Sequence, residues 1–156
     1  MEPILGTKKA KQICIIVKDV EQAKEKWAEF LGLPTPPTTN AGPYEITQAE
    51  YRGKPEKIAN CKMAAFDLSE EMQLEVLEPV GGVPSEWQNF LDENGEGIHH
   101  FAFGVKDTEE RLKDAAKAGF GCTQKGKYNN GSGMYAYLET RPELKATMET
   151  LETFEN

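Results

Sequence analysis

Two adjacent histidines, His99 and His100, are the only imidazole side chains in this sequence. They lie in the stretch GEGIHHFAFGVKD, residues 95–107, where they enter a predicted β-strand. An imidazole can ligate a metal ion or move a proton near neutral pH. A strand histidine can equally be a buried side chain with satisfied hydrogen bonds. Both interpretations of His100 stay open on these residues alone. Because side chains alternate along a strand, only one of the two imidazoles is expected to face a pocket.

Two glutamates recur in a short motif of the form ExLE. Glu75 begins the copy in MQLEVLEP, and Glu149 begins the copy in ATMETLE. A carboxylate held in a pocket can act as a general base. Charged residues on strands also protect sheet edges from aggregation, and Glu78 and Glu152 show that glutamate is common in this sequence. The motif by itself therefore leaves both roles open.

The chain contains an internal repeat. The tripeptide VKD occurs at residues 17–19 and again 88 residues later, at residues 105–107. The two ExLE motifs follow in the same order, 74 residues apart, as expected if a loop is shorter in the second half. Two matches in the same order indicate duplicated units. The 88-residue shift places Gln12 of the first unit at the position of His100 in the second.

Each unit is predicted to have the order βαβββ. A β-branched strand at residues 11–18 precedes a helix that begins at Asp19 and ends at Gly32. In the second unit, Asp107 and Glu110 repeat this N-cap pattern before a second helix. Further strands are predicted at residues 44–51, 60–68, 72–78, 121–128, 134–139 and 146–152.

These elements predict an α+β fold in which two βαβββ modules form paired curved mixed sheets around a concave pocket, with the helices outside. The predicted organisation is a single domain, residues 1–156, with a first module at 9–80, a linker with a short helix at 81–97, and a second module at 98–153. Alternation along the strands then directs four polar side chains to the concave side: Gln12, Glu75, His100 and Glu149.

Composition narrows the possible partners. The net charge of −8, without a stripe of Lys and Arg, argues against nucleic acid and anionic membranes. The start, MEPILGTKKAKQ, has no hydrophobic signal core, so we expect a cytoplasmic protein with a small-molecule substrate.

Three widely spaced cysteines indicate buried, reduced thiols, and Cys14 shares the pocket-facing side of its strand with Gln12. Whether the chain forms a homodimer, with the pocket within one chain or at the interface, stays open.

The two units resemble the vicinal oxygen chelate superfamily, which includes glyoxalase I, methylmalonyl-CoA epimerase, extradiol dioxygenases and bleomycin-resistance proteins. The resemblance covers residues 9–153 and is carried by QICIIV, where the family usually has HIGIAV, and by LEVLEP, GIHHFAF and METLE. The resemblance identifies the fold but says little about the substrate, since one fold hosts many functions.

The resemblance implies a site for one divalent metal. Carried over to this sequence, the family's ligand positions fall on Gln12, Glu75, His100 and Glu149. The departure is Gln12, since the family has histidine there and a glutamine carbonyl oxygen is a weaker donor. Three oxygens and one nitrogen suit Mn, Co, Ni, Mg or Fe better than structural zinc, although a Zn ion stays among the candidates.

Three functions are compatible with these features. The first is a divalent-metal-dependent isomerase or lyase of the glyoxalase or epimerase type, in which Glu149 or Glu75 removes a proton next to a carbonyl and the metal chelates the enolate. The second is a metal-free small-molecule-binding protein like the bleomycin-resistance proteins. An Fe(II) dioxygenase ranks last because it normally needs two histidines on iron. The family's epimerases also use a glutamate on an earlier strand, and the nearest position here is Lys62.

Overall fold

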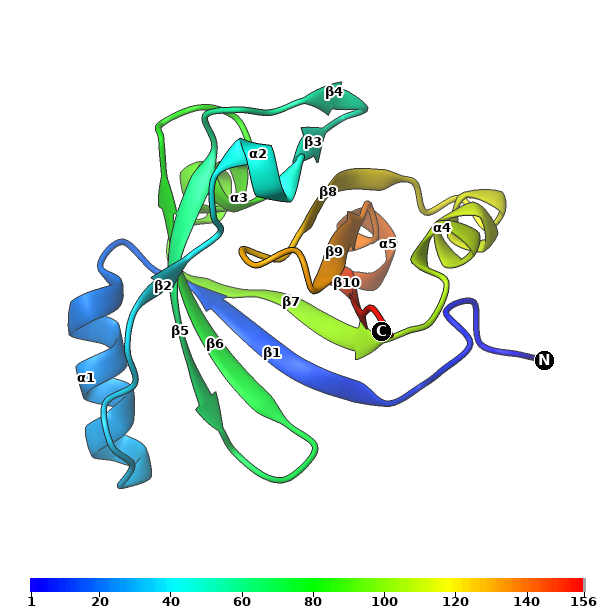
Figure 1. Cartoon of the computed structure of the whole chain (residues 1–156). Coiled ribbons are helices and arrows are strands. Elements are labelled where there is room, and N and C mark those ends of the chain that lie inside the picture. The colour runs from blue at the N-terminus through cyan, green and yellow to red at the C-terminus, as the bar shows by residue number, and fades with distance from the viewer. Residues whose placement is uncertain (156) are drawn as a thin grey trace.

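The computed structural model describes residues 1–155, and within them ten strands form one curled mixed sheet (Figure 1). Their order across the sheet is β2-β5-β6-β1-β7-β10-β9-β8-β3-β4. The strands are β1 (Ala10–Ile16), β2 (Thr39–Asn40), β3 (Glu50–Tyr51), β4 (Lys54–Pro55), β5 (Asn60–Asp67), β6 (Gln73–Val80), β7 (Gly97–Gly104), β8 (Cys122–Lys127), β9 (Gly133–Leu138) and β10 (Thr147–Thr153). The helices are α1 (Val20–Leu31), α2 (Tyr44–Thr47), α3 (Glu86–Asn94), α4 (Thr108–Lys117) and α5 (Arg141–Leu144).

Each half of the chain contributes a βαβββ series. The first consists of β1, α1, β2, β5 and β6, and β6 runs parallel to β1. The second consists of β7, α4, β8, β9 and β10, and β10 runs parallel to β7. β1 and β7 pair antiparallel and join the two series into one sheet. The predicted α+β fold with curved mixed β-structure is therefore confirmed.

Hydrophobic side chains pack on both sides of the curled sheet. α1 and α4 lie on its outer side (Figure 1), where α1 covers a cluster that includes Val20, Val76 and Phe66. On the inner side, Trp87 and Phe90 of α3 join a second cluster with tyrosines of β9. α3 therefore closes part of the concave side next to the pocket.

Side chains cap the N-terminus of α1, as the sequence predicts, and that of α3. The Asp19 carboxylate accepts a hydrogen bond from the backbone N–H of Gln22, and the Ser85 hydroxyl does the same for Gln88. Gly32 ends α1 in the left-handed conformation, with φ of 67°. Within residues 1–155, no helix is long and apolar enough to cross a membrane.

The predicted strand at residues 44–51 is wrong. Residues Tyr44–Thr47 form the short helix α2, and only Glu50–Tyr51 are extended, as β3. The chain turns sharply at Gln48, whose φ of 47° lies in the left-handed region, so a continuous strand cannot form there. β3 pairs with β8 and thereby attaches a segment of the first half to the edge of the second.

α4 is capped by a different residue from the one predicted. Asp107 has a φ of 56° and its side chain makes no capping hydrogen bond. The carboxylate of Glu152 on β10 instead accepts hydrogen bonds from the backbone N–H groups of Asp107 and Thr108 and from the Thr108 hydroxyl. These hydrogen bonds lower the pKa of Glu152, and the bond from the Thr108 hydroxyl has the largest effect. A strand residue therefore satisfies the first free donors of the helix.

Replacing Glu152 with alanine should lower the free energy of unfolding by about 1 kcal/mol, the usual cost of losing a side-chain N-cap. Urea denaturation of Glu152→Ala measures this loss, and Glu155→Ala, at an exposed glutamate on the same chain end, is the control. Because the pKa of Glu152 is lowered on folding, its contribution is present above the ordinary value of 4.5 and disappears as the pH falls through the lowered pKa. Equal stability of the two variants would contradict the capping role.

Candidate metal centre and active site

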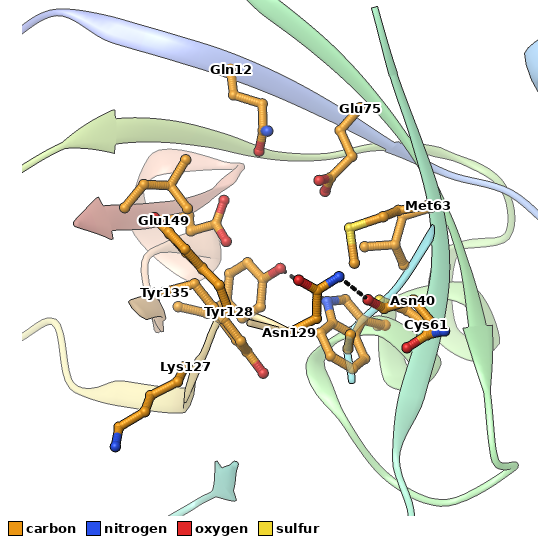
Figure 2. Close-up of a pocket in the computed structure, with 15 residues that line it drawn as sticks. Gln12, Asn40, Cys61, Met63, Glu75, Lys127, Tyr128, Asn129, Tyr135 and Glu149 are labelled. Carbon is orange, nitrogen blue, oxygen red and sulfur yellow. Dashed lines mark hydrogen bonds between the residues drawn. The ribbon is translucent and has the colours of Figure 1, made fainter. Parts of the chain in front are cut away.

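The structure brings the four predicted site residues together. Gln12, Glu75, His100 and Glu149 lie on β1, β6, β7 and β10, which are adjacent in the sheet. The Nε2 atom of His100 lies 2.9 Å from Oε2 of Glu149, 3.4 Å from Oε1 of Gln12 and 3.9 Å from Oε1 of Glu75. Figure 2 shows the side chains of Gln12, Glu75 and Glu149 pointing into one cavity. Three oxygens therefore surround one imidazole nitrogen.

A neighbouring glutamine fixes the orientation of the Gln12 amide. The Nε2 group of Gln12 donates a hydrogen bond of 2.8 Å to Oε1 of Gln73. Since the amide nitrogen is engaged there, the carbonyl oxygen of Gln12 faces His100. Gln12 thus presents to the cavity the one atom that can bind a cation.

The donor atoms fit a divalent cation. Oε2 of Glu149 is buried and has no hydrogen-bond partner among the described residues, despite its short distance to His100. Two ligand atoms that bind one octahedral ion at its usual distance lie about 3 Å apart, close to the separations around His100. Gln12, Glu75, His100 and Glu149 would hold such an ion, which would also satisfy the unpartnered oxygen.

Cys14 approaches the same cluster. Ligand atoms of Cys14, Glu75 and His100 all lie within 4.8 Å of one another. Burial and then the nearby carboxylates of Glu75 and Glu149 raise the pKa of the Cys14 thiol, which keeps it protonated in the metal-free protein. Its strand parity already pointed to the pocket in the sequence, and as a softer donor it would favour Co or Zn over Mg.

A β-bulge places both imidazoles on the same side of β7. His100 pairs with Cys14 and Ile98 pairs with Ile15, so His99 has no partner on β1. The extra residue breaks the alternation of side chains, and Nδ1 of His99 lies 2.8 Å from Nδ1 of His100. The prediction that the two imidazoles face opposite sides is therefore wrong.

The other half of the repeat contains the equivalent bulge. On β1, the register shifts between Ala10 and Gln12, so Lys11 has no partner on β7. Lys11 and His99 are 88 residues apart, which is the shift of the sequence repeat. Each half therefore inserts one residue directly before its candidate ligand.

Glu86 of α3 is a site residue that the sequence does not reveal. Its Oε2 atom lies 3.2 Å from Nε2 of His99, and its Oε1 atom accepts a hydrogen bond from the Thr123 hydroxyl. An acidic residue in the first turn of a helix is common for its interaction with the helix dipole. Only the three-dimensional contact with His99 distinguishes Glu86 from such a residue.

The cavity beside the four candidate ligands has a volume of about 180 Å³. Residues of both halves line it, including Asn40, Trp87 and the segment Lys127–Asn129. The side-chain amide of Asn129 donates a hydrogen bond of 3.1 Å to the backbone carbonyl of Asn40, which links the two halves at the cavity (Figure 2). Tyr135 and Tyr137 are both core residues and part of the cavity wall. The wall of the cavity therefore combines aliphatic and aromatic side chains with two carboxylates, those of Glu75 and Glu149.

Comparison with protein families identifies the chain. The model of the Glyoxalase/Bleomycin resistance protein/Dioxygenase superfamily matches residues 11–138. The chain belongs to this superfamily. The resemblance to vicinal oxygen chelate proteins is thereby confirmed. The comparison with curated proteins gives no match.

Solved structures of several proteins share the fold of this chain. A hypothetical protein from Bacillus halodurans is 24% identical with a TM-score of 0.64, over 95% of this chain and 96% of that one. Methylmalonyl-CoA epimerase from Mycobacterium tuberculosis is 16% identical with a TM-score of 0.64, over 97% and 91%. A Streptomyces coelicolor methylmalonyl-CoA epimerase in complex with 2-nitronate-propionyl-CoA is 18% identical with a TM-score of 0.63, over 94% of each chain. At these identities the likeness shows the fold alone.

Lys62 on β5 is the nearest position to the epimerases' earlier-strand glutamate that the sequence offers. Its side chain is 55% exposed and lies 3.8 Å from Glu78. The carboxylates that line the cavity are those of Glu75 and Glu149. Proton transfer in this chain would therefore have to use that pair.

Burial sets the protonation of the site. It raises the pKa of Glu75 to about 7 and that of Glu149 to about 8, and the nearby imidazoles offset only part of the shift. Burial also lowers the pKa of His99 and His100 to about 4, so both rings are neutral at pH 7. Burial alone would raise the pKa of Glu86, but its hydrogen bonds with His99 and Thr123 outweigh this and lower it.

The metal-free protein should lose stability as the pH rises from about 6.5 to about 8. The folded state holds protons on Glu75 and Glu149 in this range and the unfolded state does not, so stability falls as the pH increases. Below pH 6.5 the two histidines have the opposite effect on stability. Their pKa is lowered on folding, so the unfolded state binds more protons there and stability rises with pH. Thermal unfolding in the presence of a chelator measures the effect. Glu149→Gln should flatten the decline, and a wild-type stability that rises over this window would contradict the assigned shifts.

Gln12→His should tighten the binding of Co, Ni and Zn on the order of tenfold, since imidazole is the better donor for these ions. The strand should tolerate the change, because the equivalent position of the second half already carries His100. A competition titration with a chelating dye gives the affinity, and the melting temperature without metal is the control. Unchanged or weaker binding would mean that residue 12 does not face the ion.

Proposed function

We propose that this protein is a divalent-metal-dependent isomerase or lyase of the glyoxalase or epimerase type, which removes a proton next to a carbonyl group. The observation that carries the proposal is the buried Oε2 atom of Glu149, which has no hydrogen-bond partner among the described residues and faces the cavity. A buried carboxylate oxygen without a partner costs stability. A proton on Glu149 offsets part of this cost in the metal-free protein, and a bound cation would replace that proton and leave the carboxylate able to accept a proton from the substrate.

Glu149 is proposed as the base and Glu75 as its counterpart. The two carboxyl groups extend from β10 and β6 into the same cavity. A pKa raised towards neutrality makes a carboxylate a more effective base than an exposed one. With one group accepting and the other returning a proton, the pair can change the configuration or the position of a substrate hydrogen.

The other residues of the cavity orient the substrate and exclude water. The indole N–H of Trp87 donates a hydrogen bond of 2.9 Å to the Tyr137 hydroxyl, which holds both rings in the wall. The amide of Gln12 is held by Gln73, so it needs no rearrangement to bind a cation. When bound, a divalent cation supplies Lewis-acid stabilisation of negative charge on the substrate oxygen.

A carbonyl compound with an acidic neighbouring hydrogen is the proposed substrate class. Two of the three structural neighbours described above are named methylmalonyl-CoA epimerases, and one of these is in complex with 2-nitronate-propionyl-CoA. Acyl-CoA thioesters are therefore the first compounds to test. Fe(II) dioxygenase chemistry is less suited to the site, because His100 is the one imidazole whose Nε2 faces the candidate ligands while that of His99 contacts Glu86.

Incubation with methylmalonyl-CoA and related thioesters in D2O tests this proposal. With Mn²⁺ or Co²⁺ present, wild-type protein should introduce deuterium at the carbon next to the thioester carbonyl, as measured by mass spectrometry. Glu149→Gln should lower the exchange rate by about 100-fold or more, the usual contribution of a general base. Glu78→Gln, on β6 but outside the cavity lining, is the matched control and should exchange at the wild-type rate.

Metal binding is measured separately by thermal unfolding. Mn, Co or Ni should raise the melting temperature of the wild type, since an ion that binds only the native state stabilises it, and His100→Ala should abolish the shift. Absence of a shift at millimolar metal, together with tight binding of a small molecule, would replace the proposal with a metal-free binding protein. Exchange that persists in excess chelator would contradict the metal dependence alone.

A further inference from the structure

The two histidines and Glu86 form a continuous chain of contacts that we call the histidine relay. It runs from Oε2 of Glu86 to Nε2 of His99 at 3.2 Å, and from Nδ1 of His99 to Nδ1 of His100 at 2.8 Å. At its inner end, Nε2 of His100 faces the oxygens of the candidate ligands. The relay thus connects a residue behind the pocket with the proposed metal centre.

The relay fixes where the protons lie. A carboxylate only accepts hydrogen bonds, and that of Glu86 accepts one from the Thr123 hydroxyl as well as facing His99. Nε2 of His99 must therefore carry the hydrogen. A neutral imidazole has one N–H, so Nδ1 of His99 is an acceptor, and the short contact between the two Nδ1 atoms requires His100 to donate. Nε2 of His100 is then left with its lone pair towards the cavity. Oε2 of Glu149 lies 2.9 Å from this atom, but burial raises the pKa of Glu149 to about 8, so the carboxyl group holds a proton at pH 7 and presents no anion to the lone pair.

The opposite arrangement of protons would place lone pairs against each other. If His100 carried its hydrogen on Nε2, its Nδ1 would have to accept from His99. The Nε2 lone pair of His99 would then face the Glu86 carboxylate at 3.2 Å, in a position where the His99 ring is fully buried. Repulsion between a lone pair and an anion is strong where water cannot screen it.

The His99 ring is held in the orientation that the relay needs. The backbone carbonyl of His99 accepts a hydrogen bond of 2.7 Å from the Arg141 guanidinium. Its ring packs edge-on against Phe90 and Tyr137, with centroids 5.1 Å and 5.5 Å away. The bulge that excludes His99 from the β1 ladder makes this position available.

We propose that Glu86 and His99 are positioning residues that set the Nδ1–H tautomer of His100 and so reserve its Nε2 lone pair for a divalent cation. This inference deepens the proposed function and rests on it for the role of the cation. The tautomer itself, however, is a property of the metal-free protein and can be measured without metal or substrate. Partners of this kind behind a ligating histidine commonly change metal affinity by about 10–100-fold when they are replaced.

Nitrogen-15 NMR of histidine-labelled, metal-free protein tests the tautomer directly. In the wild type, His100 should show a protonated Nδ1 and an unprotonated Nε2. His99→Phe keeps an aromatic ring against Phe90 and Tyr137 but removes the acceptor for His100. His100 should then move its hydrogen to Nε2, where the side-chain carbonyl oxygen of Gln12 lies 3.4 Å away and accepts it. A protonated Nε2 of His100 in the wild type would overturn the inference, whether or not the protein binds metal.

Metal titrations with Mn²⁺ and Co²⁺ give the second readout. His99→Phe and Glu86→Met should each weaken binding by about 10–100-fold, while Glu93→Met, the same substitution at an exposed position of α3, should bind as the wild type does. Glu86→Met leaves His99 in place, so it tests the relay even if the buried His99→Phe variant fails to fold. Weakened binding with an unchanged His100 tautomer would overturn the proposed positioning role, and wild-type affinity in both variants would do the same. If the wild type binds no metal but has the expected tautomer, the proposed function fails and the assignment of the tautomer stands.

Discussion

The central constraint on this structure is the burial of two carboxylates and an imidazole that face one another. An ionised carboxylate away from water is costly unless a proton, a hydrogen-bond donor or a cation compensates it. In the metal-free protein, bound protons compensate the burial of these carboxyl groups, because burial raises the pKa of Glu75 to about 7 and that of Glu149 to about 8. A divalent ion would replace these protons, so metal binding and proton release are coupled.

The sheet supplies the geometry for this arrangement. Parallel pairing of β1 with β6 and of β7 with β10, joined by the antiparallel pair β1 and β7, brings four strands of the repeat side by side. A bulge precedes the candidate ligand on each of the two central strands, at Lys11 and at His99. In the first half the bulged side chain is exposed, and in the second it is buried against α3. The duplicated backbone has thus acquired different roles in its two halves.

Strand alternation divides the glutamates of the ExLE motif into two roles. Glu149 faces the cavity, while Glu152, three residues later, faces α4 and caps it. Likewise Glu75 faces the cavity and Glu78 contacts Lys62. Residues three apart in a strand point to opposite faces, so one motif serves both the site and the packing around it. Glu152 also links β10 to α4, which lies directly after the strand that carries His100.

The sequence by itself determined the duplicated βαβββ order apart from the second strand of the first half, the ends of α1 and the face on which Gln12, Glu75, His100 and Glu149 lie. Local periodicity and capping residues are written in neighbouring residues. The internal repeat is found by comparing the two halves of the chain, 88 residues apart. Only the tertiary structure decided that a bulge turns His99 towards His100, that Glu86 lies behind them, that Glu152 caps α4 and that β3 pairs with β8. Each of these depends on register and on contacts between residues far apart in the chain. Such contacts are selected by the packing of the whole sheet, and no local pattern encodes them.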